Sequence, residues 1–285
     1  MRSIAVMTSG GDSPGMNAGI RSVVRAALTR GWKVWLVEDG WEGLIDGRLR
    51  LATWSDVAHI LQLGGTILGT ARSDRFRTME GRRAACQQLA SKDVDGLVCI
   101  GGDGSLTGAN FLRTEWAEHK KALGIDGSNS MPLLDIVGMV GSIDNDLAGF
   151  TQTIGADSAL HRIISAVDSI VSTALSHGRT FVIEVMGRSS GYLALAAAMI
   201  CGADWVFIPE RPDGEDWPVK MCRQILAGRE MHRRKSIILL AEGAVTIAGE
   251  RITSEQVKTA IEKVGCFFFC YVVLLFSFLF EGAPL

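Results

Sequence analysis

The sequence predicts an α/β protein built on mainly parallel sheets flanked by helices. Two observations favour this class. Short apolar segments alternate with longer amphipathic segments over most of the 285 residues, which is typical of repeated strand–helix–strand units. Three apolar segments also lead into glycine-rich or acidic turns, at residues 8–17, 101–105 and 141–146. In open α/β sheets such turns follow the carboxyl ends of strands, where ligands bind.

The expected strands are short and apolar enough to be covered on both faces. They cover residues 3–8, 33–37, 94–100, 135–141, 180–186, 205–208 and 236–240. The expected helices cover residues 16–30, 54–62, 79–91, 105–121, 156–176, 190–200, 215–230 and 254–264. Thr53 with Asp56, and Thr253 with Gln256, have the spacing of side chains that satisfy free amides at a helix start. The polar segment 124–132 is expected to form a surface excursion.

Composition excludes several classes of protein. Lys and Arg (29) against Asp and Glu (31) give a net charge of 29 − 31 = −2, so the chain lacks the overall basic field of nucleic-acid binders. The six cysteines form no CxxC pair, which argues against zinc or dithiol chemistry and favours a reducing cytosol. The amino end begins with a strand-like segment and resembles no secretory signal. We therefore expect a cytoplasmic protein without a nucleic-acid partner.

The segment 266–285 departs from this pattern. The 17 residues from 264 to 280 carry no charge and are mainly aromatic and aliphatic, without period 2 or 3.6. Three explanations are open: a tail anchor, a pair of buried strands, or translated non-coding sequence. Seventeen residues is about the minimum that spans a bilayer, and the change in composition is abrupt. We expect an aberrant apolar tail rather than a membrane partner.

The first motif is the turn TSGGDSPGMN at residues 8–17. A glycine turn lets backbone amides approach an anion closely, and the following helix adds its positive amino end. The turn could therefore cradle a phosphate, although a tight turn that only needs positive φ is the alternative. It matches neither the Walker pattern nor GxGxxG.

The second motif is GGDGS at residues 101–105, again between an expected strand and helix. Two glycine turns at the carboxyl ends of strands in one sheet could face one ligand. Asp103 is placed to hold Mg²⁺, which takes one or two protein carboxylates together with phosphate oxygens. The alternative is that Asp103 caps the helix.

The third motif is GSIDND at residues 141–146. Its carboxylates, Asp144 and Asp146, suit the general base that phosphoryl transfer to an alcohol needs. An Asx-rich turn is the alternative. Glu242 also follows an apolar segment, within reach of sugar hydroxyls or as a helix cap. Arginines that could bind phosphate in the planar fork geometry, or be solvated surface charges, are Arg72, Arg77, Arg162, Arg179 and Arg188.

These three motifs occur in order with LGGTILGTAR, RTFVIEVMGR and CGADWVFIPE. Together they closely resemble the ATP-dependent 6-phosphofructokinases, from Ile4 to about Val264. The GGDG motif also occurs in NAD and lipid kinases, but GSIDND and EVMGR argue against that alternative. The long segment between GGDGS and GSIDND is similar to the eukaryotic type, whose subunits are duplicated. The chain would then match part of the N-terminal half.

The resemblance implies Mg²⁺-dependent transfer of the γ-phosphoryl group of ATP to the C1 hydroxyl of fructose 6-phosphate, in glycolysis. It implies a homo-oligomer, a tetramer in the family, with allosteric regulation. The implied ATP site consists of Gly11, Arg72, Ser73, Gly102, Asp103, Gly104 and Ser105, with Asp103 on the metal. The implied catalytic residues are Asp144, as the base, and Arg188. The implied sugar site consists of Ser142, Ile143, Asp144, Met186, Gly187, Arg188 and Glu242, with Arg179 serving a neighbouring subunit's sugar phosphate. Gly104 and Gly141 would favour ATP over pyrophosphate, because pyrophosphate-using relatives carry Asp and Lys there.

The resemblance also implies a domain division. We expect an ATP-binding domain at 1–155, a sugar-phosphate-binding domain at 156–265 and the aberrant tail at 266–285. In the family, the chain beyond this point supplies an arginine and a His-Val-Gln-Arg motif to the sugar phosphate, and residues 265–285 contain no such motif. We therefore expect impaired catalysis, with a non-catalytic nucleotide-binding fragment or pseudoenzyme subunit as the alternative.

Overall fold

The structure is a computed structural model that describes residues 2–125, 133–263 and 270–274. It divides into two compact units. The first comprises Met1–Ser142 with Thr153–Gly155, and the second comprises Ile143–Gln152 with Ala156–Leu285. Which unit binds the nucleotide and which binds the sugar phosphate stays a prediction. The predicted surface excursion at 124–132 lies almost wholly outside the described residues.

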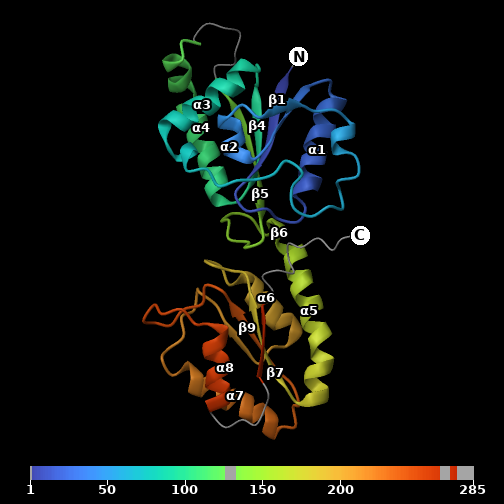
Figure 1. Cartoon of the computed structure of the whole chain (residues 1–285), viewed down its shortest axis with the longest axis vertical. Coiled ribbons are helices and arrows are strands. Elements are labelled where there is room, and N and C mark those ends of the chain that lie inside the picture. The colour runs from blue at the N-terminus through green and yellow to red at the C-terminus, as the bar shows by residue number, and fades with distance from the viewer. Residues whose placement is uncertain (1, 126–132, 264–269, 275–285) are drawn as a thin grey trace. The chain divides into compact units, whose positions relative to one another are not determined.

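The first unit is built on a six-stranded sheet with the order β3-β2-β1-β4-β5-β6 (Figure 1). Its pairings are parallel except that between β2 and β3. The strands are β1 Ser3–Ser9, β2 Lys33–Val37, β3 Leu49–Leu51, β4 Gly96–Gly101, β5 Asp135–Ser142 and β6 Ile154–Gly155. The helices are α1 Met16–Thr29, α2 Gly40–Ile45, α3 Met79–Ser91 and α4 Asp103–Ala122, with 3-10 turns η1 Ser55–Val57 and η2 Arg75–Arg77.

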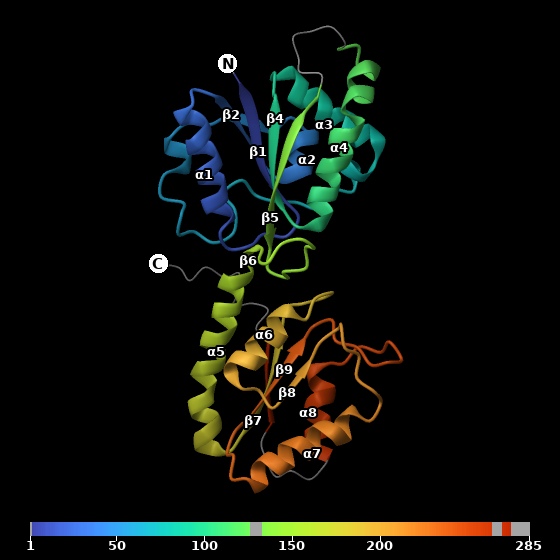
Figure 2. The same cartoon turned by 180° about the vertical axis from the view of Figure 1, so that it is seen from behind.

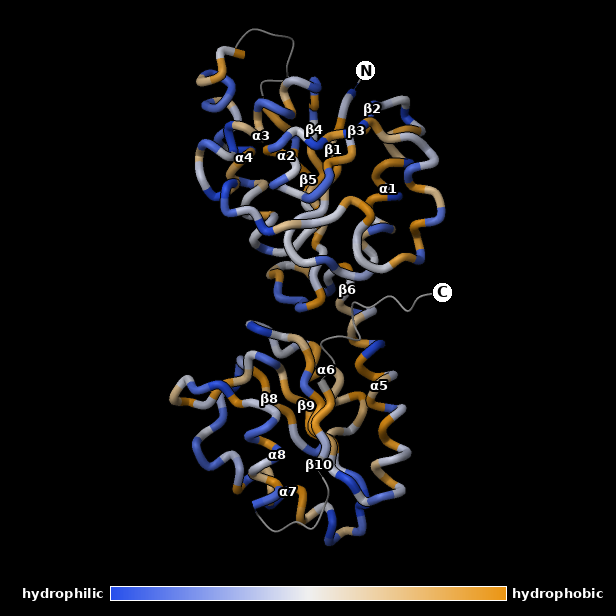
Figure 3. Tube along the Cα trace, viewed as in Figure 1, coloured by the Kyte–Doolittle hydropathy of each residue, from blue (hydrophilic) through white to orange (hydrophobic). Residues whose placement is uncertain are grey.

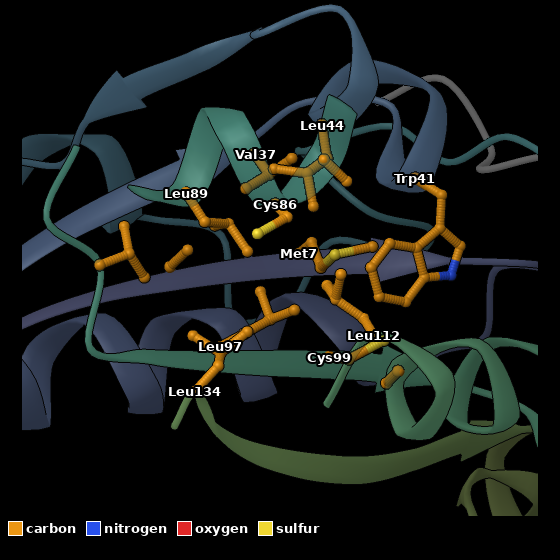
Figure 4. Packing of buried hydrophobic residues seen from close by; sticks show 14 of the residues in the cluster. Met7, Val37, Trp41, Leu44, Cys86, Leu89, Leu97, Cys99, Leu112 and Leu134 are labelled. Atoms are coloured by element: carbon orange, nitrogen blue, oxygen red, sulfur yellow. The ribbon is translucent and has the colours of Figure 1, made fainter. Parts of the chain in front are cut away.

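Helices cover both faces of this first sheet. Helix α1 packs on one face, where Ile20 and Val24 meet Val6 of β1 in a buried cluster. Helices α2, α3 and α4 pack on the other face around Met7, as the close view in Figure 4 shows. Burial raises the pKa of Cys99 in that cluster to about 12, so this thiol packs as an apolar group instead of acting as a nucleophile.

The second unit is built on a four-stranded parallel sheet with the order β10-β7-β9-β8. Figure 2 labels its strands β7, β8 and β9. The strands are β7 Thr180–Val185, β8 Trp205–Phe207, β9 Ser236–Ala241 and β10 Cys270–Leu274. The helices are α5 Ala156–His177, α6 Tyr192–Cys201, α7 Trp217–Glu230 and α8 Ser254–Lys263. Helices α5 and α6 cover one face and α7 and α8 the other.

Most predicted strands and helices are confirmed. The short apolar segments that predict the strands and the longer amphipathic segments that predict the helices are strong signals. In both sheets the central strands are hydrophobic along most of their length (Figure 3), as parallel strands covered on both faces are. The spacing of Thr253 and Gln256 is also confirmed as a reciprocal cap of α8. The amide of Thr253 donates to Gln256 Oε1 at 2.9 Å, and the amide of Gln256 donates to Thr253 Oγ1 at 3.2 Å.

The predicted helix at 54–62 is wrong. Only the 3-10 turn η1 forms there. The side chain of Asp56 accepts both the amide and the hydroxyl of Thr53, and His59 takes a left-handed conformation at φ 56°, which a continuing helix does not allow. Helix α2 is not predictable from the sequence, because its six residues GWEGLI contain two glycines, which are poor helix formers.

Part of the predicted apolar tail is a strand of the second sheet. Residues Cys270–Leu274 form β10, which pairs in parallel with β7 from Thr180 to Glu184. The remaining tail residues lie outside the described part of the chain. Within the described ranges, no helix combines the length and the apolar character that a membrane span requires.

Candidate functional site

The first unit brings two glycine turns to one edge of its sheet. Strand β1 pairs in parallel with β2 on one side and with β4 on the other. The turn after β1 leads into α1 on one face, and the turn after β4 leads into α4 on the opposite face. This divergence is a topological switch point, the place where open α/β sheets bind ligands.

The turn after β1 requires glycine. Gly10 has φ 88°, and a Cβ atom there would come within 2.9 Å of Ser105 Oγ on α4, so Ser105 lies directly against the first turn. Gly11 is exposed, and a Cβ atom added to it would meet no atom within 4 Å. The backbone at Gly11 is therefore open to a ligand.

The turn after β4 presents Asp103 and Gly104 to solvent as the first residues of α4. The N-cap of this helix is Gly102, without a side-chain cap bond, which contradicts the alternative that Asp103 caps the helix. A Cβ atom at Gly104 would meet nothing within 4 Å. An exposed carboxylate and an open backbone at a helix amino end suit an anion accompanied by a cation.

A loop spanning residues 63–72 is tied to the first glycine turn. Thr8 Oγ1 donates to the carbonyl of Gly69 at 2.9 Å and lies 2.8 Å from Thr66 Oγ1. Thr70 Oγ1 donates to the carbonyl of Gly10 at 2.7 Å. Arg72 follows two residues later and is exposed, so the loop delivers this arginine close to the turn.

Ser73 is engaged by neighbouring residues. Its hydroxyl donates to Glu42 of α2 and accepts the amide of Phe76 at 3.1 Å. The Ser73 hydroxyl, followed by the Arg75 guanidinium, holds the pKa of Glu42 below its usual range. The side chain of Ser73 thus anchors the loop to α2, and a ligand would meet its backbone more readily than its hydroxyl.

The second unit has a comparable edge at the carboxyl ends of β7 and β9. These strands pair in parallel, with Val185 opposite Ala241, and lead into α6 on one face and α8 on the other. The turn Met186–Arg188 and Glu242 therefore lie side by side. Gly243 packs so closely on this turn that a Cβ atom would lie 1.8 Å from the carbonyl oxygen of Arg188. Arg188 is exposed.

Asp144 lies at this edge of the second unit. Burial, followed by the charges of Asp146 and Glu242, raises the pKa of Asp144 above its ordinary value. Ser190 Oγ donates to the Asp144 carbonyl at 2.7 Å, which fixes the backbone against the start of α6. Ile143, directly before it, is buried in the core of this unit. A half-buried carboxylate held on rigid backbone, with a raised pKa, has the properties of a general base.

The predicted site residues fall into two groups and one outlier. The first unit gathers Gly11, Arg72, Ser73, Gly102, Asp103, Gly104, Ser105 and Ser142 at the carboxyl edge of its sheet. The second unit gathers the other group at the carboxyl edge of its own sheet, namely Ile143, Asp144, Met186, Gly187, Arg188 and Glu242. Arg179 precedes β7, so the six residues of that strand, about 20 Å, separate it from the second group. Its guanidinium lies 4.6 Å from the ring centroid of Tyr271 on β10.

Comparison with known proteins gives the family. The family model described as "Phosphofructokinase" matches residues 3–273. The chain belongs to the phosphofructokinase family. The match continues past Val264, where we expected the resemblance to end, and includes most of β10.

Relatives of known name support the same membership. The chain is 50% identical over 270 residues to the muscle-type ATP-dependent 6-phosphofructokinase of Mus musculus, which covers 92% of this chain and 35% of the relative. It is 49% identical over 268 residues to the platelet-type ATP-dependent 6-phosphofructokinase of Homo sapiens, and the match covers 91% of this chain and 34% of the relative. The chain therefore spans about a third of the length of the curated phosphofructokinases that it matches.

Solved phosphofructokinase structures share the fold. The Saccharomyces cerevisiae phosphofructokinase superposes with a TM-score of 0.92 at 45% identity, over 98% of this chain and 38% of that one. The Pichia pastoris phosphofructokinase superposes with a TM-score of 0.91 at 44% sequence identity, over 99% of this chain and 30% of the Pichia pastoris chain. A pyrophosphate-dependent phosphofructokinase from Marinobacter aquaeolei, at 18% identity and a TM-score of 0.78, shows a common fold only.

The described acidic residues of the first unit suit a magnesium ion that is shared with a phosphate ligand. Within the described residues, no group of three or more His, Cys, Asp or Glu side chains could enclose a metal. Asp103 offers one exposed carboxylate beside open glycine backbone. Mg²⁺ commonly binds through one or two carboxylates, several waters and the phosphates of its substrate. The residues of this phosphofructokinase-family chain therefore fit Mg²⁺ carried on a nucleotide and do not fit a metal caged by protein ligands.

Three residues that shape these edges carry no recognisable functional signal in the sequence. Ser190 fixes the backbone of Asp144, Thr70 ties the loop to Gly10, and Asn17 binds the same loop from α1. Each lies within or beside a quoted motif, but its hydrogen-bond partner is 46 to 60 residues away in sequence. Only the folded chain reveals such partners.

Proposed function

We propose that the chain carries the nucleotide and sugar-phosphate sites of an ATP-dependent 6-phosphofructokinase. The reaction transfers the γ-phosphoryl group of ATP to the C1 hydroxyl of fructose 6-phosphate and yields fructose 1,6-bisphosphate, a step of glycolysis. The observation that carries this proposal is that Asp144, Arg188 and Glu242 come together at one edge of the second sheet. The names of the relatives, ATP-dependent 6-phosphofructokinase, supply the substrates.

In this proposal the first unit holds the nucleotide. The backbone of Gly11 and of residues 102–105 faces the phosphates, since the amides at the amino end of α4 favour anions. Arg72 approaches the same phosphates, and Ser73 holds its loop in place. Asp103 would hold Mg²⁺ on the nucleotide. When bound, the ion neutralises charge on the phosphoryl oxygens.

The second unit holds the sugar phosphate and the base. Asp144 accepts the proton of the C1 hydroxyl, and its raised pKa makes it a stronger base than an ordinary aspartate. Arg188 stabilises the charge on the transferring group through its planar donors. The sugar is lined by Ser142, Ile143, Met186, Gly187 and Glu242.

Arg179 has a different place in the proposal. It lies at the amino end of β7, about one strand length from Arg188, too far to share a ligand with it inside one subunit. As the family resemblance implies, Arg179 would serve the sugar phosphate of a neighbouring subunit in a homo-oligomer, a tetramer in the family, and its distance from Arg188 agrees with that role. The proposed setting is the cytoplasm, with allosteric control and without a nucleic-acid or membrane partner.

The test is binding and turnover by the purified chain. Calorimetry with MgATP and with fructose 6-phosphate should give two independent saturable sites, and a coupled assay should detect fructose 1,6-bisphosphate. Binding of MgATP without sugar-phosphate binding or turnover would favour the nucleotide-binding fragment instead. Failure to bind either ligand would refute the proposal.

Gly104 tests the choice of phosphoryl donor. Because a side chain at Gly104 meets no atom within 4 Å, we expect Gly104→Asp to fold like the parent chain. Its carboxylate would repel the nucleotide phosphates, so MgATP affinity should fall by about tenfold or more. Pyrophosphate affinity should fall less. Asn110→Asp, which adds the same charge on the exposed side of the same helix α4, is the control and should bind MgATP as the parent does.

A further inference from the structure

The side chain of Asn17 is buried, and its hydrogen bonds all go to one loop. It lies in the first turn of α1 and is 1% exposed. Its Nδ2 donates to the carbonyls of Leu63 and Gly64, both at 3.1 Å, and its Oδ1 accepts the amide of Ile67 at 2.8 Å. Each of these bonds goes to the backbone of the same short loop.

The other end of this loop is fastened to the first glycine turn. Thr70 donates to the carbonyl of Gly10 at 2.7 Å, and Thr8 donates to the carbonyl of Gly69 at 2.9 Å. Asn17 and these two threonines thus fix the loop at both ends. Arg72 lies two residues after Thr70, just beyond the part of the loop that these bonds fix.

The contacts of Asn17 argue for an indirect role. Both polar atoms of its amide are occupied by the loop, and the side chain has almost no accessible surface, so it cannot contact a ligand. A loop backbone that follows no regular structure has few bonds of its own, and an external side chain that satisfies three of its groups determines its position.

We propose that Asn17 is a positioning residue for the nucleotide site. It holds residues 63–70 against the first glycine turn and thereby sets the place of Arg72 beside Gly11. This inference rests on the proposed function, since it assumes that the turn binds the phosphates of ATP.

The experiment uses Asn17→Asp in the full chain. Aspartate has the same shape but cannot donate to the carbonyls of Leu63 and Gly64. These two carbonyl oxygens would then lose their donor and lie against a negatively charged carboxylate, which repels them. We expect MgATP affinity, measured by calorimetry, to fall by about tenfold or more. Affinity for fructose 6-phosphate should stay at the parent value, because the proposed sugar residues other than Ser142 belong to the second unit, and the loop that Asn17 binds does not include Ser142. Trypsin should cleave faster after Arg72.

Two variants keep the test decisive. Asn110→Asp adds the same charge on the exposed side of α4 and should leave both affinities and the cleavage rate unchanged. Thr70→Val removes the bond to Gly10 with nearly the same volume and should weaken MgATP binding alone. If Asn17→Asp does not fold, Thr70→Val decides.

The outcomes separate this inference from the proposed function. A parent chain that binds no MgATP contradicts the proposed function. A parent chain that binds MgATP, with Asn17→Asp or the deciding Thr70→Val binding it equally well, overturns the positioning role alone. Equal losses of nucleotide and sugar-phosphate affinity also overturn it, because they would indicate general destabilisation.

Discussion

Asp144→Asn should lower the turnover number by about 10²–10⁴-fold, the contribution of a general base, while MgATP affinity stays unchanged. The amide keeps the shape of the carboxylate but cannot accept the proton of the sugar hydroxyl. The melting temperature at neutral pH should not fall. Burial, Asp146 and Glu242 all disfavour the charged form of Asp144, so its replacement by a neutral group relieves an unfavourable charge.

The pH dependence supplies a second readout of the same residue. The base acts only when ionised, so kcat/KM should fall as the pH drops through the pKa of Asp144. Because that pKa is raised in the folded chain, the midpoint of the acid limb should lie above about 3.9, the ordinary value for aspartate. A midpoint at or below the ordinary value would contradict the assignment.

The control for this substitution is Asp216→Asn. Asp216 belongs to the second unit, is exposed and pairs with Lys220 of α7 at 2.9 Å. Its loss should change neither turnover nor pH profile, since exposed pairs contribute little. Equal effects of Asp144→Asn and Asp216→Asn would remove the case for a catalytic base.

Asp103→Asn should lower the rate at saturating ATP by about 10²-fold or more, because the charge that the metal neutralises in the transition state contributes several kcal/mol. The concentration of Mg²⁺ that gives half-maximal rate should rise, since an amide oxygen binds Mg²⁺ less strongly than a carboxylate. Affinity for metal-free ATP should be kept or improved. The fold should be unaffected, because Asp103 is exposed and contributes no cap bond to α4.

Asp135→Asn is the matched control in the first unit. Asp135 is exposed at the amino end of β5, on the edge of the sheet opposite to Asp103. The control should show the parent's dependence on Mg²⁺. Should Asp103→Asn also show that unchanged dependence, Asp103 would not hold the metal.

The sequence predicts the parallel sheets well because burial on both faces leaves a strong signal in strands such as β1 and β9. It fails where a few local contacts decide the conformation. The left-handed His59 and the bonds between Thr53 and Asp56 stop a helix that the pattern favours, and α2 forms despite its glycines because Trp41 and Leu44 are buried against the sheet.

The sequence motifs of the candidate site are predictable, but the residues that hold those motifs in place are not. A residue such as Asp144 or Asp103 stands in a recognisable turn after an apolar strand. Asn17 and Ser190 act through single contacts with distant segments, which no local pattern encodes. The raised pKa of Asp144 depends likewise on Glu242, almost a hundred residues later.

The chain passes from one compact unit to the other after Ser142, returns at Thr153 and leaves again after Gly155. No single division of the gene can therefore yield both halves whole. A protein engineer who cut after Gly155 would strip Asp144 from the half that also holds Arg188 and Glu242. Half-chain complementation or swapping between relatives would need two junctions, or a permuted chain that returns residues 143–152 to the second half.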